Sequence, residues 1–155
     1  MKNTFFVAIF ATTSAFATST LAESVIASDP QTVLKYFEDI GAPATIGEDN
    51  VGDPLVTFQY YGTDMAVYFY GCHEAKNCNS IQFFAGYTPE SEISMEAINL
   101  WNAENRYARA YEAENGGKRL EYDIYTGNAG VSADDFDEMF DLWTELVKDF
   151  EDKMS

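Results

Sequence analysis

The sequence of 155 residues has few of the side chains on which most catalytic and metal sites depend. It has one histidine, two cysteines and nine Lys and Arg residues, against 26 Asp and Glu residues. The net charge of −17 would repel a phosphate backbone, so a nucleic-acid partner is not expected. Anionic membrane surfaces are disfavoured for the same reason. A nucleophilic triad needs an imidazole base oriented beside a Ser or Cys, and a single histidine leaves little scope for one.

The sequence also lacks an apolar run of membrane-spanning length. The longest run, residues 5–17, has 13 residues, short of the roughly 20 that a spanning helix needs. It follows a positively charged start, contains no acid and leads to a signal-peptidase motif ending at Ala22, with Ala17 as an alternative cut. We therefore predict a cleaved signal peptide over residues 1–22 and a single domain over residues 23–155. The mature protein would be periplasmic, without membrane insertion.

The two cysteines lie six positions apart in a turn-like stretch between two strand-like runs. An oxidising compartment favours a disulfide between Cys72 and Cys78. The alternatives are a pair of free thiols, or a zinc or copper(I) site in which His73 and Glu74 add to the two thiolates. That ligand set is only partial, so we predict the disulfide, no metal and no other cofactor. A metal- or small-molecule-responsive periplasmic sensor built on this loop is the alternative function.

Aromatic residues, in contrast, are abundant at 15%, so the acidic chain is expected to fold rather than to remain disordered. Apolar spacing predicts helices over residues 30–40, from Ser94 to near Asn105, and from Ser132 to Phe150. The predicted strands are 44–48, 55–61, 65–70, 81–87, 107–113 and 120–125. The order is helix, three to four strands, helix, two strands, helix. It predicts an α+β fold with helices packed on one face of an antiparallel sheet.

Acidic residues are densest near the start of the last predicted helix, over residues 134–141. Paired acids can serve glycoside hydrolysis, and acidic loops can bind calcium. Here they fall on the outward face of an amphipathic helix and lack the glycine-bent Asp-x-Asp loop of an EF-hand. We interpret them as a solvated helix face, predict no catalytic residue and do not expect an enzyme.

Several segments between Asp53 and Phe150 together resemble one bacterial family. They are Asp53-Pro54-Leu55, Val67 to Cys72, Cys78 to Phe83, Ile98-Asn99-Leu100-Trp101-Asn102, Arg106-Tyr107-Ala108-Arg109-Ala110-Tyr111 and Leu142-Trp143. This pattern resembles the YbjN family, which is described as bacterial sensory-transduction regulators. The resemblance implies a type III secretion chaperone-like fold and a regulatory or chaperone-like binding role. It implies no substrate, cofactor or catalytic residue.

A protein or peptide is the expected partner, and five residues are candidates for binding it. They are Trp101, Asn102, Arg106, Arg109 and Tyr111. Arginine can bind a carboxylate through two hydrogen bonds and can stack on tyrosine, so the two arginines could line a groove for an acidic group. Alternatively, they could pin the second helix to the next strand through local acids such as Glu104, with the tryptophan in the core. A tyrosine-rich sheet face could also bind a peptide or a second copy of the chain.

Overall fold

A computed structural model describes residues 24–89 and 93–154 of the chain. The predicted signal peptide, residues 1–22, lies outside the described residues, and so does its cleavage site. Among the helices that are described, none is both long and apolar enough to cross a bilayer.

Three helices and eight strands follow one another along the described chain. In order they are β1 (Ser24–Val25), α1 (Pro30–Asp39), β2 (Ala44–Glu48), β3 (Pro54–Tyr60), β4 (Thr63–Tyr70), β5 (Ser80–Tyr87), α2 (Met95–Glu104), β6 (Ala108–Glu112), β7 (Lys118–Tyr125), β8 (Val131–Ser132) and α3 (Ala133–Met154).

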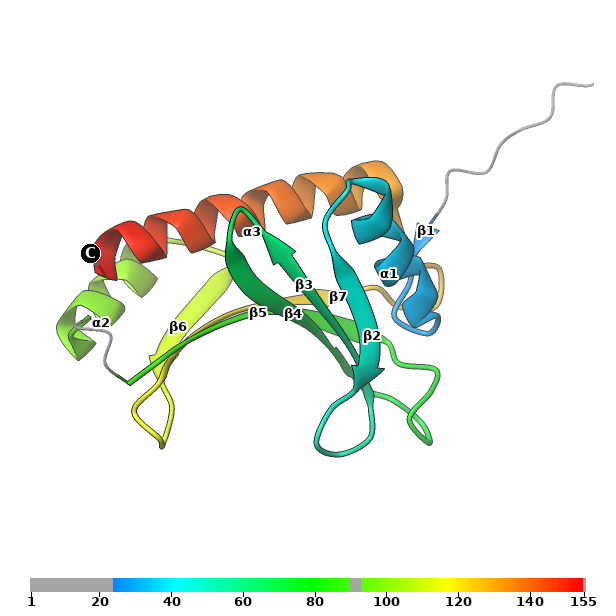
Figure 1. Cartoon of the computed structure of the whole chain (residues 1–155), viewed down its shortest axis with the longest axis horizontal. Coiled ribbons are helices and arrows are strands. Elements are labelled where there is room, and N and C mark those ends of the chain that lie inside the picture. The colour runs from blue at the N-terminus through cyan, green and yellow to red at the C-terminus, as the bar shows by residue number, and fades with distance from the viewer. Residues whose placement is uncertain (1–23, 90–92, 155) are drawn as a thin grey trace, which may run out of the picture.

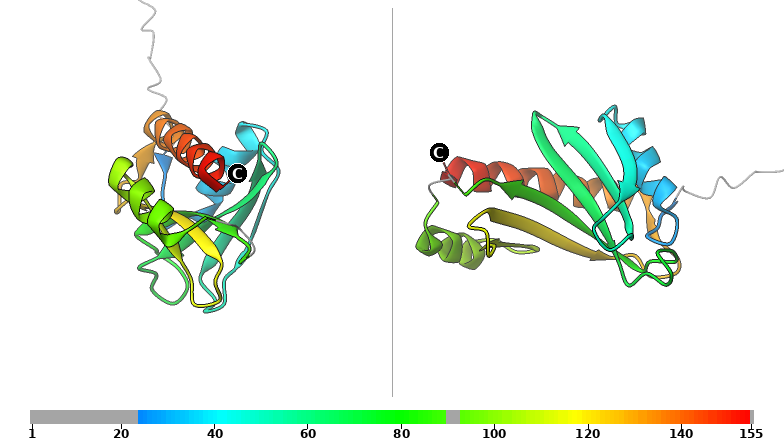
Figure 2. Two further views of the ribbon diagram at one scale, coloured as in Figure 1. Left: turned by 90° about the vertical axis from the view of Figure 1, so that its left-hand side faces the viewer. Right: turned by 60° about the horizontal axis from the view of Figure 1, so that its bottom comes forward.

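Strands β2 to β7 form one antiparallel sheet in the order β2-β3-β4-β5-β7-β6, and β1 pairs with β8 in a second, two-stranded sheet. Helix α3 runs along one face of the large sheet with α1 beside it (Figure 1). The α+β fold predicted from the sequence is thereby confirmed. Helix α2 lies at the end of the molecule, where it connects β5 to the outer strand β6 and so leaves the position between them to β7 (Figures 1 and 2).

The helix boundaries follow from local side-chain chemistry. The Asp29 side chain accepts a hydrogen bond from the backbone N–H of Gln31, and Pro30 occupies the first turn, where its missing N–H costs nothing. At the start of α3, Ser132 Oγ accepts from the Asp135 N–H at 3.1 Å and donates to the Asp135 carboxylate at 2.7 Å. Both caps confirm the start sites predicted from the sequence.

The core lies between the large sheet and the apolar stripe of α3. That stripe consists of Phe136, Phe140, Trp143, Leu146, Val147 and Phe150, all of them buried. The Trp143 indole stacks on Phe83 of β5 with ring centroids 5.7 Å apart. Phe37 of α1 stacks on Phe58 of β3 at 4.0 Å. Because α1 and α3 both pack here, one face of the sheet is covered along its length.

The segment after β7 closes against the N-terminal strand. Gly130 has a φ of +75°, and a Cβ there would lie 2.9 Å from the Val25 carbonyl oxygen. A side chain at this position would therefore be strained in its backbone and crowded by β1. Glycine thus permits the pairing of β1 with β8.

Cys72 and Cys78 form the predicted disulfide across the loop that joins β4 to β5. Their Cα atoms are 3.8 Å apart, and Cys78 is buried. The loop between them is exposed, and Glu74, Ala75 and Asn77 all have positive φ values. Three residues without glycine's freedom are thus held in the left-handed region by a short closed loop.

We expect the Cys72→Ser/Cys78→Ser double substitution to lower the free energy of unfolding by about 2 kcal/mol, because it frees a short loop in the unfolded chain. Urea unfolding with and without reductant measures this loss. Reductant should destabilise the native protein by the same amount and leave the double variant unchanged. A reductant effect of equal size in both proteins would contradict this assignment.

Candidate functional site

The large sheet has a second face, turned away from α1 and α3, which we call the open face. Side chains alternate between the two faces of a strand. On β5, Phe83 packs against α3, so its neighbours Gln82 and Phe84 point to the open face. No described helix packs on the open face, which makes it the surface to examine for binding (Figure 1).

An apolar hollow of about 670 Å³ occupies the part of the open face that spans β2 to β5. Its lining includes the side chains of Leu55, Thr57, Ala66, Tyr68 and Phe84. Tyr68 and Phe84 meet edge to face, with centroids 5.3 Å apart. We call this feature the apolar hollow.

The floor of the apolar hollow is shaped by a glycine next to Phe84. A Cβ placed on Gly86 would lie 2.9 Å from the Phe84 ring, so the ring folds over the bare backbone. Any larger residue at position 86 would push the ring aside. Gly86 therefore sets the direction of Phe84 and the shape of the hollow at β5.

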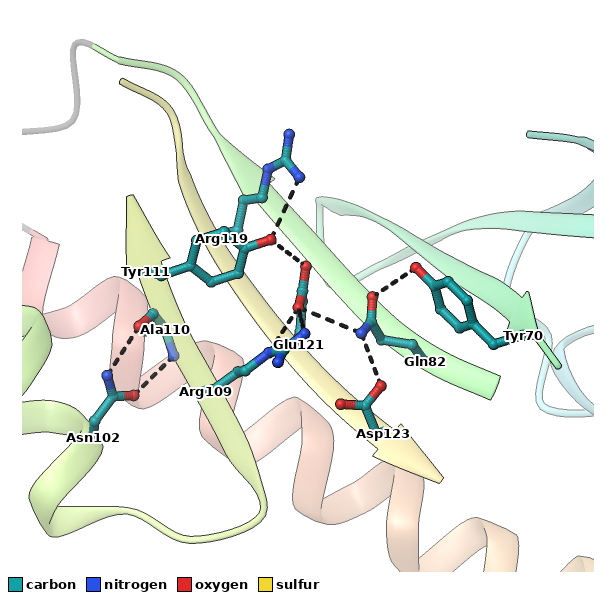
Figure 3. A network of polar contacts seen from close by, with 9 residues as sticks. All are labelled: Tyr70, Gln82, Asn102, Arg109, Ala110, Tyr111, Arg119, Glu121 and Asp123. Atoms are coloured by element: carbon teal, nitrogen blue, oxygen red, sulfur yellow. Dashed lines mark hydrogen bonds and ion pairs between the residues drawn. The ribbon is translucent and has the colours of Figure 1, made fainter. Parts of the chain in front are cut away.

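A polar network covers the other half of the open face, over β5, β7 and β6, and Glu121 is at its centre (Figure 3). This carboxylate is only 5% exposed. Arg109 donates to its Oε2 twice, from Nε at 2.9 Å and from Nη2 at 2.6 Å, and the Tyr111 hydroxyl donates to its Oε1 at 2.6 Å. The hydrogen bond to Glu121 raises the pKa of Arg109, so the cation stays charged.

Gln82 extends the network toward β4 (Figure 3). Its amide nitrogen donates to Asp123 at 2.8 Å and more weakly to Glu121 at 3.4 Å, and its amide oxygen accepts from Tyr70 at 3.4 Å. The buried amide is thereby satisfied on both sides. The network joins side chains of four adjacent strands, β4, β5, β7 and β6, and gives half of the open face a polar surface.

Of the five candidate binding residues, only Arg109 and Tyr111 lie in this network. Trp101 is 1% exposed and donates to Asp149 of α3 at 2.8 Å, so it belongs to the core rather than to the surface. Asn102 makes two hydrogen bonds to the backbone of Ala110, at 2.8 and 2.9 Å, and thereby occupies the free edge of β6 (Figure 3).

Arg106 is exposed in the loop before β6 and forms no ion pair with the described residues. The ion pairs differ from the one considered in the sequence analysis, in which Arg106 and Arg109 pair with local acids such as Glu104. Glu104 faces Lys153 at 3.8 Å, while Arg109 reaches across to Glu121 on the neighbouring strand. The two arginines therefore do not form one patch with a shared acid.

The tyrosines divide between the two faces of the sheet. Tyr60 and Tyr87 point inward, where they contact Phe140 and Phe150 of α3. Burial and the neighbouring Glu151 carboxylate raise the pKa of Tyr87. The tyrosines on the open face are Tyr68, Tyr70, Tyr111 and Tyr125. Four of the ten tyrosines of the chain therefore lie on the open face.

The remaining candidate residues form no ligand set in the structure. His73 is exposed on the disulfide loop, where its backbone pairs with Lys76. The acids at 134, 135, 137, 138 and 141 are exposed on α3. Over residues 24–89 and 93–154, no three His, Cys, Asp or Glu side chains lie close enough together to hold a metal ion.

Sequence reasoning missed Arg119, Glu121 and Gln82, as well as the residues that line the apolar hollow. One signal was present: charged residues alternate along β7 at 119, 121 and 123, which places all three on one face. The hollow left no such signal, because its lining mixes apolar residues such as Leu55 and Phe84 with polar ones such as Thr57, and no pattern sets them apart from their neighbours in the strands.

The fold and this surface together define an α+β domain with one helix-covered sheet face and one open face. A family model matches residues 29–155, which is most of the chain, and its description is "Putative bacterial sensory transduction regulator". The chain belongs to this family, YbjN, as the sequence resemblance suggested. No curated protein matches the sequence.

Proposed function

We propose that this protein is a non-enzymatic binding module that holds a segment of a partner protein on the open face of its sheet. The role would be regulatory or chaperone-like, and the protein would act in the periplasm after removal of its signal peptide. The family description supports the regulatory part of the proposal. Two features support export. The apolar run at residues 5–17 follows the positively charged Lys2, as in a signal peptide. The Cys72–Cys78 disulfide is typical of a protein in an oxidising compartment.

The apolar hollow is the observation that carries this proposal. A sheet normally covers its apolar side chains, and here Leu55, Tyr68 and Phe84 remain partly accessible around about 670 Å³ of open space. An extended or helical segment with two or three apolar side chains would fill such a space. The polar network beside the hollow would limit how that segment is oriented.

The alternative is a metal- or small-molecule-responsive sensor built on the Cys72–Cys78 loop. Its metal-responsive form needs thiolates from both cysteines, and both sulfur atoms are in the disulfide. His73 alone, exposed on the same loop, would be a weak ligand.

Site-specific photocrosslinking in intact cells tests the proposal. We expect a photoreactive residue at Thr57, on the rim of the apolar hollow, to form adducts with a partner protein. The same residue at Glu138, exposed on the outer face of α3, is the matched control and should form none of these adducts. Adding Leu55→Asp to the Thr57 protein should reduce the adducts about tenfold, because it places a carboxylate in an apolar contact.

Thermal unfolding of the Leu55→Asp protein establishes that it still folds. Adducts that form equally at Thr57 and Glu138 would contradict the proposal, as would adducts insensitive to Leu55→Asp. Adducts of twice the mass of the chain would identify the occupant as a second copy and overturn the proposal of a separate partner.

A further inference from the structure

Arg119 of β7 lies where the apolar hollow meets the polar network. It is the cross-strand neighbour of Gly86, whose backbone forms part of the hollow. A second hollow of about 330 Å³ shares Phe84 and Gly86 with the first and continues to Arg119. A third, of about 470 Å³, lies between Arg119 and Tyr111. The open face thus has a continuous path from the apolar hollow to this guanidinium.

The Arg119 guanidinium lies within cation–π distance of two aromatic rings. Its Cζ lies 5.8 Å from the Phe84 ring centroid and 5.9 Å from that of Tyr111. Its Nη1 donates to the Tyr111 hydroxyl at 3.4 Å, and that hydroxyl in turn donates to Glu121 (Figure 3). The side chain is therefore positioned before any partner arrives, which lowers the entropy lost on binding.

Arg119 is also a cation without a counter-ion. Among the described residues, no carboxylate lies within ion-pair distance of it, although acids outnumber cations almost threefold in the chain. The nearby Glu121 carboxylate already accepts hydrogen bonds from Arg109 and Tyr111. Guanidinium has five N–H donors, and Arg119 uses one of them here, in a long hydrogen bond.

We propose that Arg119 receives the carboxylate of an Asp or Glu side chain in the partner segment that fills the apolar hollow. This inference rests on the proposed function and names the chemistry of the segment. The guanidinium fork matches a carboxylate in shape, and among the described residues only one of its five N–H donors makes a hydrogen bond. One cation without an ion pair, at this place on the open face, suits one negative charge. A phosphate dianion would face the net charge of −17 with less compensation.

The geometry also limits the sequence of the segment. Adjacent strands are about 4.8 Å apart, and Arg119 lies one strand beyond Gly86. The acidic residue should therefore follow or precede an apolar residue by one to three positions, at about 3.3 Å per extended residue.

A second copy of this chain is a poor occupant, because two molecules of net charge −17 would be brought together.

Selection of random peptides displayed on phage against the purified protein tests this inference. We expect the enriched peptides to combine one Asp or Glu with neighbouring large apolar residues. One such peptide is then synthesised in two forms, acidic and with the acid replaced by its amide. The native protein should bind the acidic form about tenfold more tightly, which corresponds to about 1.4 kcal/mol.

Variants of the protein locate the contact. Arg119→Gln should lower affinity for the acidic peptide about tenfold and leave affinity for the amide peptide within about twofold. Arg106→Gln, at an exposed arginine with no described ion pair, is the matched control and should bind both peptides as the native protein does. Thermal unfolding confirms that each variant folds.

The possible failures are distinguishable. Peptides that enrich, depend on Leu55 and lack an acid would overturn the role of Arg119 and leave the proposed function standing. A charge preference that disappears with Arg106→Gln instead of Arg119→Gln would overturn the role of Arg119 in the same way. If no peptide enriches, both proposals fail.

Discussion

Replacement of Trp143 by alanine is expected to lower the free energy of unfolding by about 4 kcal/mol. The indole is 0% exposed at the middle of α3, where it stacks on Phe83 at an interplanar angle of 14°. Its Nε1 donates to the sulfur of Met65 on β4 at 3.2 Å. Truncation would therefore leave a cavity at the contact between α3 and two central strands, and it would also remove the hydrogen bond to the Met65 sulfur.

Urea unfolding followed by circular dichroism measures this loss. Trp143→Phe, which keeps the stacking and loses only part of the volume, should cost about half as much. Glu145→Ala is the matched control on the same helix; its side chain is exposed, so we expect a change within about 0.5 kcal/mol. Equal losses in Trp143→Ala and Glu145→Ala would show that α3 does not pack on the sheet through this indole.

Features decided by neighbouring residues could be predicted from the sequence. The cap between Ser132 and Asp135 is formed by two side chains three positions apart, so the pattern alone shows it. The Asn115-Gly116-Gly117 turn joins β6 and β7; Asn-Gly is typical of hairpin turns, and Gly116 has a positive φ of 82°. The disulfide also depends on a short loop, and it too could be predicted.

Features that depend on the order of strands in the sheet could not be predicted in the same way. Strand β7, rather than β6, lies next to β5, and this placement brings Gln82, Glu121 and Arg109 together from positions far apart in the chain. Spacing along the sequence carries no information about that neighbour relation. The sequence led to Arg109 and Tyr111, but their partner Glu121 and the adjacent Arg119 became visible only with the register known.

The strand register also determines whether loss of Arg109 or loss of the Glu121 charge lowers the free energy of unfolding more. Glu121 is buried, whereas the Arg109 side chain is 63% exposed. Removal of the arginine leaves a buried carboxylate that has lost its two shortest nitrogen donors. Removal of the carboxylate's charge leaves an arginine that water can still solvate. The two substitutions should therefore have unequal effects.

We expect Arg109→Ala to lower the free energy of unfolding by about 2 kcal/mol and Glu121→Gln by about 1 kcal/mol. The double variant should be more stable than Arg109→Ala alone, because the neutral amide no longer needs a cation. Urea unfolding of the four proteins gives this comparison as a double-mutant cycle. Arg106→Ala, an exposed arginine without a described ion pair, should change stability by less than about 0.5 kcal/mol.

The sign of the coupling decides whether Glu121 is the buried charge that organises the open face. If the double variant loses the sum of both single effects, the carboxylate does not depend on Arg109, and the network cannot be what holds Tyr111. If Glu121→Gln restores stability to Arg109→Ala, the carboxylate is the costly group and Arg109 stabilises it. Arg109 then acts as a positioning residue: by compensating Glu121, it keeps the Tyr111 hydroxyl at 2.6 Å from Oε1 and so holds the ring beside which Arg119 lies.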